Sequence, residues 1–124
     1  MTKPVLVVED DTDIREALVG ILRDEGFTAD GVGNGAEALA RLRGPAAPPA
    51  LILLDLMMPV MNGWQFRAEQ QQDDALKSIP VVVISADSGV KQKAESLAVN
   101  GYLKKPVDLD QLLEIVARYC GAAS

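Results

Sequence analysis

The stretch from residue 51 to residue 63 reads Leu51-Ile52-Leu53-Leu54-Asp55, followed by Leu56-Met57-Met58-Pro59-Val60-Met61-Asn62-Gly63. Four apolar residues run without alternation into one carboxylate, and a cluster containing proline and glycine follows. A short continuous apolar run is typical of a strand buried on both faces, as in a parallel sheet covered by helices. Such sheets bind ligands beyond the carboxyl ends of their strands. Asp55 could serve a ligand there, or it could only cap a turn or the next helix.

Composition and charge set the class of the protein. The chain has 124 residues, of which 48% are hydrophobic, so we expect a single globular domain over residues 1–124. Its net charge of −6 disfavours direct binding to nucleic acid, which needs clustered lysine and arginine. The longest apolar runs are far shorter than the roughly 20 residues of a membrane-spanning helix, so no membrane partner is expected.

Two residue counts narrow the chemistry. The single cysteine, Cys120, cannot form an internal disulfide, which fits a cytoplasmic protein. We expect Cys120 to be part of the core, because no histidine exists to activate it. The lack of histidine also excludes Ser-His-Asp and Cys-His catalysis, as well as metal sites built on imidazole.

Apolar runs and helical spacing alternate along the whole chain. Strands are predicted at residues 4–8, 27–32, 51–55, 80–85 and 101–104. Helices are predicted at about residues 11–26, 35–43, 64–72, 88–97 and 108–120, the last with a capping-box-like pair at Asp108 and Gln111. Five strands alternating with five helices predict an α/β fold, a doubly wound parallel sheet of order 2-1-3-4-5.

This topology brings distant polar residues to one edge of the sheet. Glu9 and Asp10 follow the first strand, Asp55 and Ser85 end the third and fourth, and Lys105 follows the fifth. Three converging carboxylates repel one another unless a cation joins them, and an oxygen-only ligand set suits Mg²⁺. A lysine and a hydroxyl complete a site for a phosphoryl group. A carboxylate such as that of Asp55 can then act as the nucleophile and form an acyl phosphate.

Four segments together carry a resemblance to a known family. They are Val5-Leu6-Val7-Val8-Glu9-Asp10-Asp11, Leu53-Leu54-Asp55-Leu56-Met57-Met58-Pro59-Val60-Met61-Asn62-Gly63, Val83-Ile84-Ser85-Ala86 and Gly101-Tyr102-Leu103-Lys104-Lys105-Pro106. In this order and at this spacing they resemble the receiver domains of bacterial two-component response regulators, over essentially the whole chain. The resemblance implies a flavodoxin-like, or CheY-like, (βα)5 fold.

The resemblance also implies roles for the acidic residues. Asp55 would be the phosphoacceptor, and its donor would be a phosphohistidine on a sensor histidine kinase or a histidine phosphotransfer protein. Glu9, Asp10 and Asp55 would hold Mg²⁺, with the backbone carbonyl of Met57 as a further ligand. The domain would assist its own phosphorylation and dephosphorylation without being an enzyme in any other sense.

Three further residues receive roles by the same resemblance. Ser85 matches the switch hydroxyl, Tyr102 the aromatic switch residue, and Lys105 the phosphate-binding lysine. We expect the Lys105-Pro106 bond to be cis and the lysine to reach toward Asp55. Phosphorylation would change the face formed by the fourth helix, fifth strand and fifth helix, where an output protein that the sequence does not identify would bind. Tyr102 could also be an ordinary packing residue.

Two other functions compete with a phosphorylation-controlled signalling module. One is a Mg²⁺-dependent phosphatase that works through an aspartyl phosphate. Such enzymes resemble Asp-x-Asp sites, but this chain has Met57 at the position of the second carboxylate. The other is a degenerate receiver that only binds partners, against which the set of Asp55, Ser85 and Lys105 argues. The chain is either a stand-alone receiver or part of a longer regulator. It departs from the family in having Ala98-Val99 where Gly-Ala often ends the fourth helix.

Overall fold

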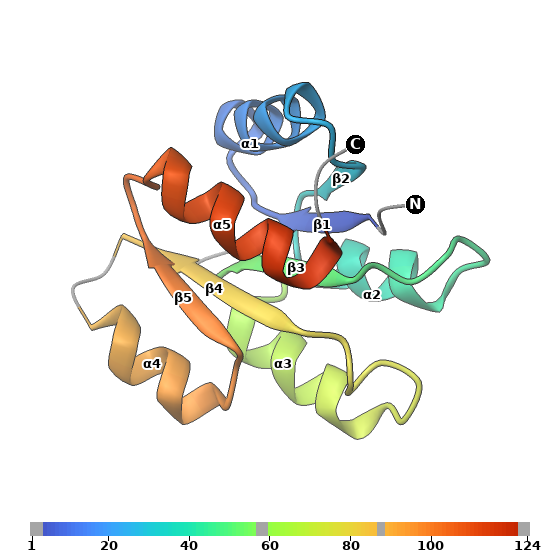
Figure 1. Ribbon diagram of the computed structural model, residues 1–124. Coiled ribbons are helices and arrows are strands. Elements are labelled where there is room, and N and C mark those ends of the chain that lie inside the picture. The colour runs from blue at the N-terminus through green and yellow to red at the C-terminus, as the bar shows by residue number, and fades with distance from the viewer. Residues whose placement is uncertain (1–3, 57–59, 87–88, 122–124) are drawn as a thin grey trace.

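The protein forms one parallel sheet with helices on both sides (Figure 1). The computed structural model describes residues 4–56, 60–86 and 89–121. The sheet has the predicted order β2-β1-β3-β4-β5, and all of its paired strands are parallel. Its strands are β1 (Val5–Val8), β2 (Ala29–Val32), β3 (Leu51–Asp55), β4 (Val81–Ser85) and β5 (Gly101–Lys104).

Five helices cover the two faces of the sheet. They are α1 (Thr12–Asp24), α2 (Gly35–Arg43), α3 (Gly63–Gln72), α4 (Val90–Leu97) and α5 (Leu109–Cys120). Helices α1 and α5 lie on one face, and α2, α3 and α4 lie on the other (Figure 1). Among the described residues, no helix has the length and apolar character needed to span a bilayer.

Strand β3 is the centre of the core, as its apolar run predicts. Leu51 and Leu53 pack into the cluster beneath α1 and α5, whereas Ile52 and Leu54 pack into the cluster beneath α2 and α3. All four side chains are completely buried. Each such side chain contributes about 1.5–3 kcal/mol relative to exposure, so β3 alone supplies a large part of the stability.

The sequence interpretation misplaces some element ends. The strand expected at residues 27–32 begins only at Ala29, because the N–H of Phe27 donates to the carbonyl of Leu22 in α1, at 3.0 Å, and not to a neighbouring strand. The helix expected from residue 88 begins at Val90, and Ser88 lies outside the described residues. A complete capping box, which the sequence analysis does not predict, occurs at Asn62 and Gln65 at the start of α3.

Cys120 has the structural role that the sequence predicts. It is 6% exposed and packs in the cluster beneath α5. Burial raises the pKa of its thiol to about 11, so the thiol stays protonated at neutral pH. A protonated, buried thiol is a poor nucleophile, in agreement with a place in the core.

Candidate functional site

The polar residues singled out in the sequence meet at the carboxyl edge of the sheet. Glu9 directly follows β1, whose Val8 pairs with Leu54 of β3, and Asp55 is the next residue of β3. Asp55 in turn pairs with Ile84 of β4, one residue before Ser85. The polar residues line a hollow of about 530 Å³ at this edge. Its walls are formed by Glu9, Asp10, Asp11, Ile14, Asp55, Ser85, Ala86 and Lys105.

Three carboxylates lie close enough to share one cation. Oxygen atoms of Glu9, Asp10 and Asp55 all lie within 4.8 Å of one another. Glu9 and Asp55 are buried, while Asp10 is exposed. This oxygen-only donor set, partly open to solvent, fits a hard divalent cation that keeps some of its waters.

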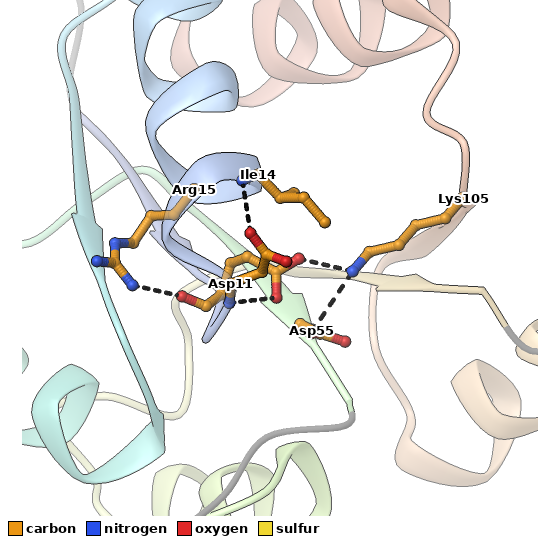
Figure 2. A network of polar contacts seen from close by, with 6 residues as sticks. Asp11, Ile14, Arg15, Asp55 and Lys105 are labelled. Atoms are coloured by element: carbon orange, nitrogen blue, oxygen red, sulfur yellow. Dashed lines mark hydrogen bonds and ion pairs between the residues drawn. The ribbon is translucent and has the colours of Figure 1, made fainter.

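Lys105 is the positive charge of this cluster. Its Nζ lies 2.6 Å from Glu9 Oε1 and 3.6 Å from Asp55 Oδ2, so the ammonium bridges two carboxylates (Figure 2). The Lys105-Pro106 bond is cis, and the lysine reaches toward Asp55, as expected. Burial lowers the pKa of Lys105, but its hydrogen bond to Glu9 and the nearby charges outweigh this effect, and the pKa is raised overall.

The turn between β1 and α1 is fixed by contacts that the sequence interpretation partly missed. Arg15 Nη1 donates to the backbone carbonyl of Glu9 at 2.9 Å (Figure 2). Asp11 caps α1 by accepting from the Ile14 N–H at 3.0 Å, and its own N–H donates to Glu9 Oε2 at 3.4 Å. The carboxylate of Glu9 is therefore oriented from two sides, by backbone and by Lys105. Arg15 gives no sequence signal, because its role depends on how α1 packs.

The turn after Asp55 depends on a glycine. The N–H of Gly63 donates to the carbonyl of Leu56 at 3.1 Å, which brings the start of α3 back against the end of β3. A Cβ at Gly63 would lie 2.9 Å from Leu56 Cα and 3.3 Å from the Asp55 carbonyl oxygen. A larger residue would therefore displace the segment that carries Asp55.

The two expected switch residues differ in exposure. Ser85 is 2% exposed at the end of β4, beside the acidic cluster, and Tyr102 of β5 is 42% exposed. Met57, whose carbonyl was expected to bind the metal, lies outside the described residues.

Comparison with known proteins identifies the family. The family model described as the response regulator receiver domain matches residues 5–117 of this chain. The chain belongs to this family. It is therefore a receiver domain of two-component signalling, and its recognition as CheY-like from four sequence segments is confirmed.

Curated relatives and solved structures agree with this assignment. Response regulator Rre1 of Synechocystis sp. is 34% identical over 121 residues, which cover 94% of this chain and 52% of that protein. A response regulator receiver protein from Pseudomonas putida has 31% identity and a TM-score of 0.86, and the match covers 95% of this chain and 98% of that one.

A third neighbour is described with a bound metal. It is the receiver domain of the sensor histidine kinase PA1611 from Pseudomonas aeruginosa, with a magnesium ion coordinated in its active site cleft. It shares the fold at a TM-score of 0.84 with 24% identity, over 98% of this chain and all of that one. Receiver domains bind Mg²⁺ in the acidic pocket, and the cluster of this receiver domain is of the matching kind.

The acidic cluster predicts a pH dependence of stability. Burial raises the pKa of Glu9 above its ordinary value of 4.5, and Asp55 adds to the rise, while Lys105 opposes it. The folded receiver domain thus binds a proton more tightly than the unfolded chain does. Without metal, the free energy of unfolding should fall as pH increases from 4.5 through the raised pKa.

Glu9→Gln tests this expectation, because glutamine keeps the shape of protonated Glu9 at every pH. Urea unfolding in EDTA at several pH values should give a flatter profile for the variant than for wild type. Added Mg²⁺ should stabilise wild type more than the variant. Equal pH slopes for the two proteins would contradict the assignment of the raised pKa to Glu9.

Val60, shortly after Asp55, gives a second prediction. It has a φ of 66° although it is β-branched, and its side chain is 81% exposed. The left-handed region costs a residue with a Cβ roughly 1 kcal/mol, and asparagine adopts it more readily. Val60→Asn should therefore raise the free energy of unfolding by up to about 1 kcal/mol.

Urea unfolding of Val60→Asn and of the control Val60→Ala separates backbone strain from loss of the side chain. Alanine also disfavours this conformation, so Val60→Ala should gain less. If Val60→Asn is less stable than wild type, the side chain of Val60 makes a favourable contact that its exposure hides.

Proposed function

We propose that Asp55 of this receiver domain accepts a phosphoryl group from a phosphohistidine. The main support is the placement of the Asp55 carboxylate beside Glu9, Asp10 and Lys105 at one edge of the sheet. In this step an Asp55 oxygen forms a bond to phosphorus as the P–N bond of the donor breaks. The electron pair goes to the imidazole nitrogen, which takes up a proton, and an aspartyl phosphate remains.

Lys105 and Ser85 would contact the phosphoryl oxygens. Lys105 can exchange part of its contact with Glu9 for a contact with the phosphoryl group, since its Nζ already lies 3.6 Å from Asp55. Ser85 can supply a hydroxyl from the end of β4. Glu9, Asp10 and Asp55, with the carbonyl of Met57, would hold Mg²⁺, which supplies charge stabilisation for phosphoryl transfer.

The output would follow from the same contacts. A dianion formed at Asp55 would attract Ser85 and Lys105. This attraction would shift the equilibrium between two arrangements of the face made by α4, β5 and α5 that differ little in free energy. We infer that Tyr102 moves inward from its exposed position and that the face made by α4, β5 and α5 then binds an output protein. The phosphodonor would be a sensor histidine kinase or a histidine phosphotransfer protein.

Other functions are less well supported. A phosphatase that works through an aspartyl phosphate would need a second carboxylate at position 57, which is Met57 here. A degenerate receiver would not need Asp55, Ser85 and Lys105 together. We therefore propose that phosphorylation controls partner binding by the domain. The domain would catalyse nothing beyond its own phosphorylation and dephosphorylation.

The setting of the domain is also part of the proposal. The chain spans about half the length of Rre1 and of a probable transcriptional regulator from Pyropia yezoensis, to each of which it is 34% identical. We propose that residues 1–124 form one receiver unit that works in the cytoplasm, in keeping with its single free thiol. Its acidic charge supports a protein as the direct partner of the receiver rather than nucleic acid.

Asp55→Asn separates a phosphoacceptor from a structural aspartate. Without metal, the variant should be more stable than wild type by about 1 kcal/mol, because one of three mutually repelling carboxylates is removed. It should be stabilised less by Mg²⁺. After incubation with Mg²⁺ and a small phosphodonor, intact mass should show one added phosphoryl group in wild type and none in Asp55→Asn.

Asp74→Asn is the matched control, since Asp74 is an exposed aspartate paired only with Lys77 within the described residues. It should be phosphorylated like wild type. A less stable Asp55→Asn whose response to Mg²⁺ equals that of wild type would mean that Asp55 is structural.

Ser85→Ala tests the switch separately from the chemistry. The variant should still be phosphorylated, but the amide shifts of α4 and β5 on binding of beryllofluoride, a phosphoryl analogue, should be smaller. NMR spectra of wild type, Ser85→Ala and the exposed control Ser78→Ala give the comparison. If the shifts in Ser85→Ala equal those in wild type, the hydroxyl of Ser85 does not transmit the change.

A further inference from the structure

Arg67 is a buried arginine of α3 that contacts the end of another helix. It is 7% exposed. Its Nε donates to the carbonyl of Leu97 at 3.1 Å, and its Nη2 donates to the carbonyl of Ala98 at 2.8 Å. Leu97 is the last residue of α4 and Ala98 is its C-cap. Arg67 thus grips α4 at one end, and the phosphorylation chemistry above does not use it.

Gln70 makes this contact part of a network. Its Oε1 accepts from Arg67 Nη1 at 2.8 Å, and its Nε2 donates to the carbonyls of Leu76 and Ile79, both at 3.0 Å. Gln70 is completely buried. Among the described residues, every acceptor of the Arg67 guanidinium is neutral, so no carboxylate competes for it. The planar guanidinium therefore holds two carbonyls of α4 in a fixed position relative to α3.

The end of α4 depends on such support. Ala98 adopts the left-handed conformation, with a φ of 55°, in which its N–H donates to the carbonyls of Ala94 and Glu95. Glycine adopts this conformation more easily than alanine does. A cation at the carboxyl end of a helix is also favoured by the partial negative charge there. Arg67 supplies both a bond to the Ala98 carbonyl and that charge.

The other contacts of α4 are of a different kind, and they include Lys93 Nζ, which lies 5.7 Å from the centre of the Trp64 ring of α3. Of its eight residues, only Val90 and Ala94 are buried, and Val90 belongs to a small cluster with Leu56 and Val83. Its N-cap, Gly89, has no side chain with which to cap the helix. This end of α4 follows the segment that leaves Ser85, whereas the end gripped by Arg67 leads to β5 and Tyr102.

We propose that Arg67 is a positioning residue that fixes the carboxyl end of α4, so that α4 responds to the phosphorylated site by turning about this end. The proposal rests on the proposed function of Asp55. It assigns the larger displacement to the end of α4 nearest Ser85 and the smaller one to residues 97–99. Movement at the site would then change the tilt of α4 on the signalling face while its link to β5 stays in place.

Hydrogen exchange of the wild-type protein tests the turning motion directly. Amides of α4 residues 91–94 should change in shift or exchange rate when beryllofluoride binds, and those of Ala98 and Val99 should change much less. These last two amides report on the gripped end, because they donate to the carbonyls of Glu95 and Ala94. Equal changes along the whole of α4 would overturn the proposal.

Arg67→Met tests the grip without any phosphoryl analogue. Methionine keeps an apolar stem but removes the donors, so exchange at Ala98 and Val99 should accelerate by about tenfold or more. Arg67→Lys, which has one ammonium in place of the fork, should fall between the two. Arg43→Met is the matched control, since Arg43 also contacts α3 but is exposed and pairs with Glu69 and Asp73. It should leave both amides unchanged.

Ala98→Gly supplies a rescue experiment. Glycine relieves the left-handed strain, so in the Arg67→Met background it should restore part of the lost protection at Val99. If Arg67→Met does not fold, Ala98→Gly in the Arg67→Lys background gives the same comparison. Unchanged exchange in the folded Arg67 variants would overturn the proposal.

Failure of the proposal and failure of the phosphorylation site are distinguishable. Intact mass should show one added phosphoryl group in Arg67→Met, as in wild type, because Arg67 lies outside the acidic pocket. If wild type is not phosphorylated and beryllofluoride changes no amide, the function proposed for Asp55 fails. The turning motion then fails with it, while exchange in the metal-free variants still shows whether Arg67 grips α4.

Discussion

The burial of β3 on both faces is the constraint on which the rest of the structure depends. A strand with apolar side chains on both faces needs a layer of helices on each side. Parallel neighbours connected by helices satisfy this need, and the order β2-β1-β3-β4-β5 places β3 at the centre. Because all strands run the same way, the residues that end them gather at one edge. The site is thus a consequence of the core.

Gathering these residues creates an electrostatic problem that Lys105 partly solves. Glu9 and Asp55 are both buried, and unit charges a few ångströms apart repel strongly where water is scarce. Lys105 contacts both carboxylates, yet burial and, after it, the neighbouring Asp55 keep the pKa of Glu9 raised, so Lys105 offsets these effects only in part. A further positive charge would stabilise such a site, which is the physical basis of the cation binding proposed for it.

The fold and the main site could be read from the sequence because both depend on local signals in chain order. The apolar run before Asp55, the acidic pair at Glu9 and Asp10, and Lys105 before a proline each mark a strand end. Arg67 and Gln70 give no such signal, because they lie in a polar stretch of α3 that reads as solvent-exposed. The backbone carbonyls that they contact are 30 and 31 residues away for Arg67 and 6 and 9 residues away for Gln70, and only the folded structure reveals these contacts.

Lys105 and Arg67 differ in the charge of the groups that they contact. Lys105 is held by the charged oxygens of Glu9 and Asp55, and in the proposed function a phosphoryl group would take the place of one of these partners. Arg67 is held by neutral carbonyls that no ligand of the site can replace. An ammonium that can exchange partners suits a part that moves, whereas a guanidinium fork bound to backbone suits a part that stays. In this receiver domain the ammonium lies in the acidic cluster beyond the strand ends, and the guanidinium lies at the carboxyl end of α4, so the exchangeable contacts and the fixed contacts are in different places.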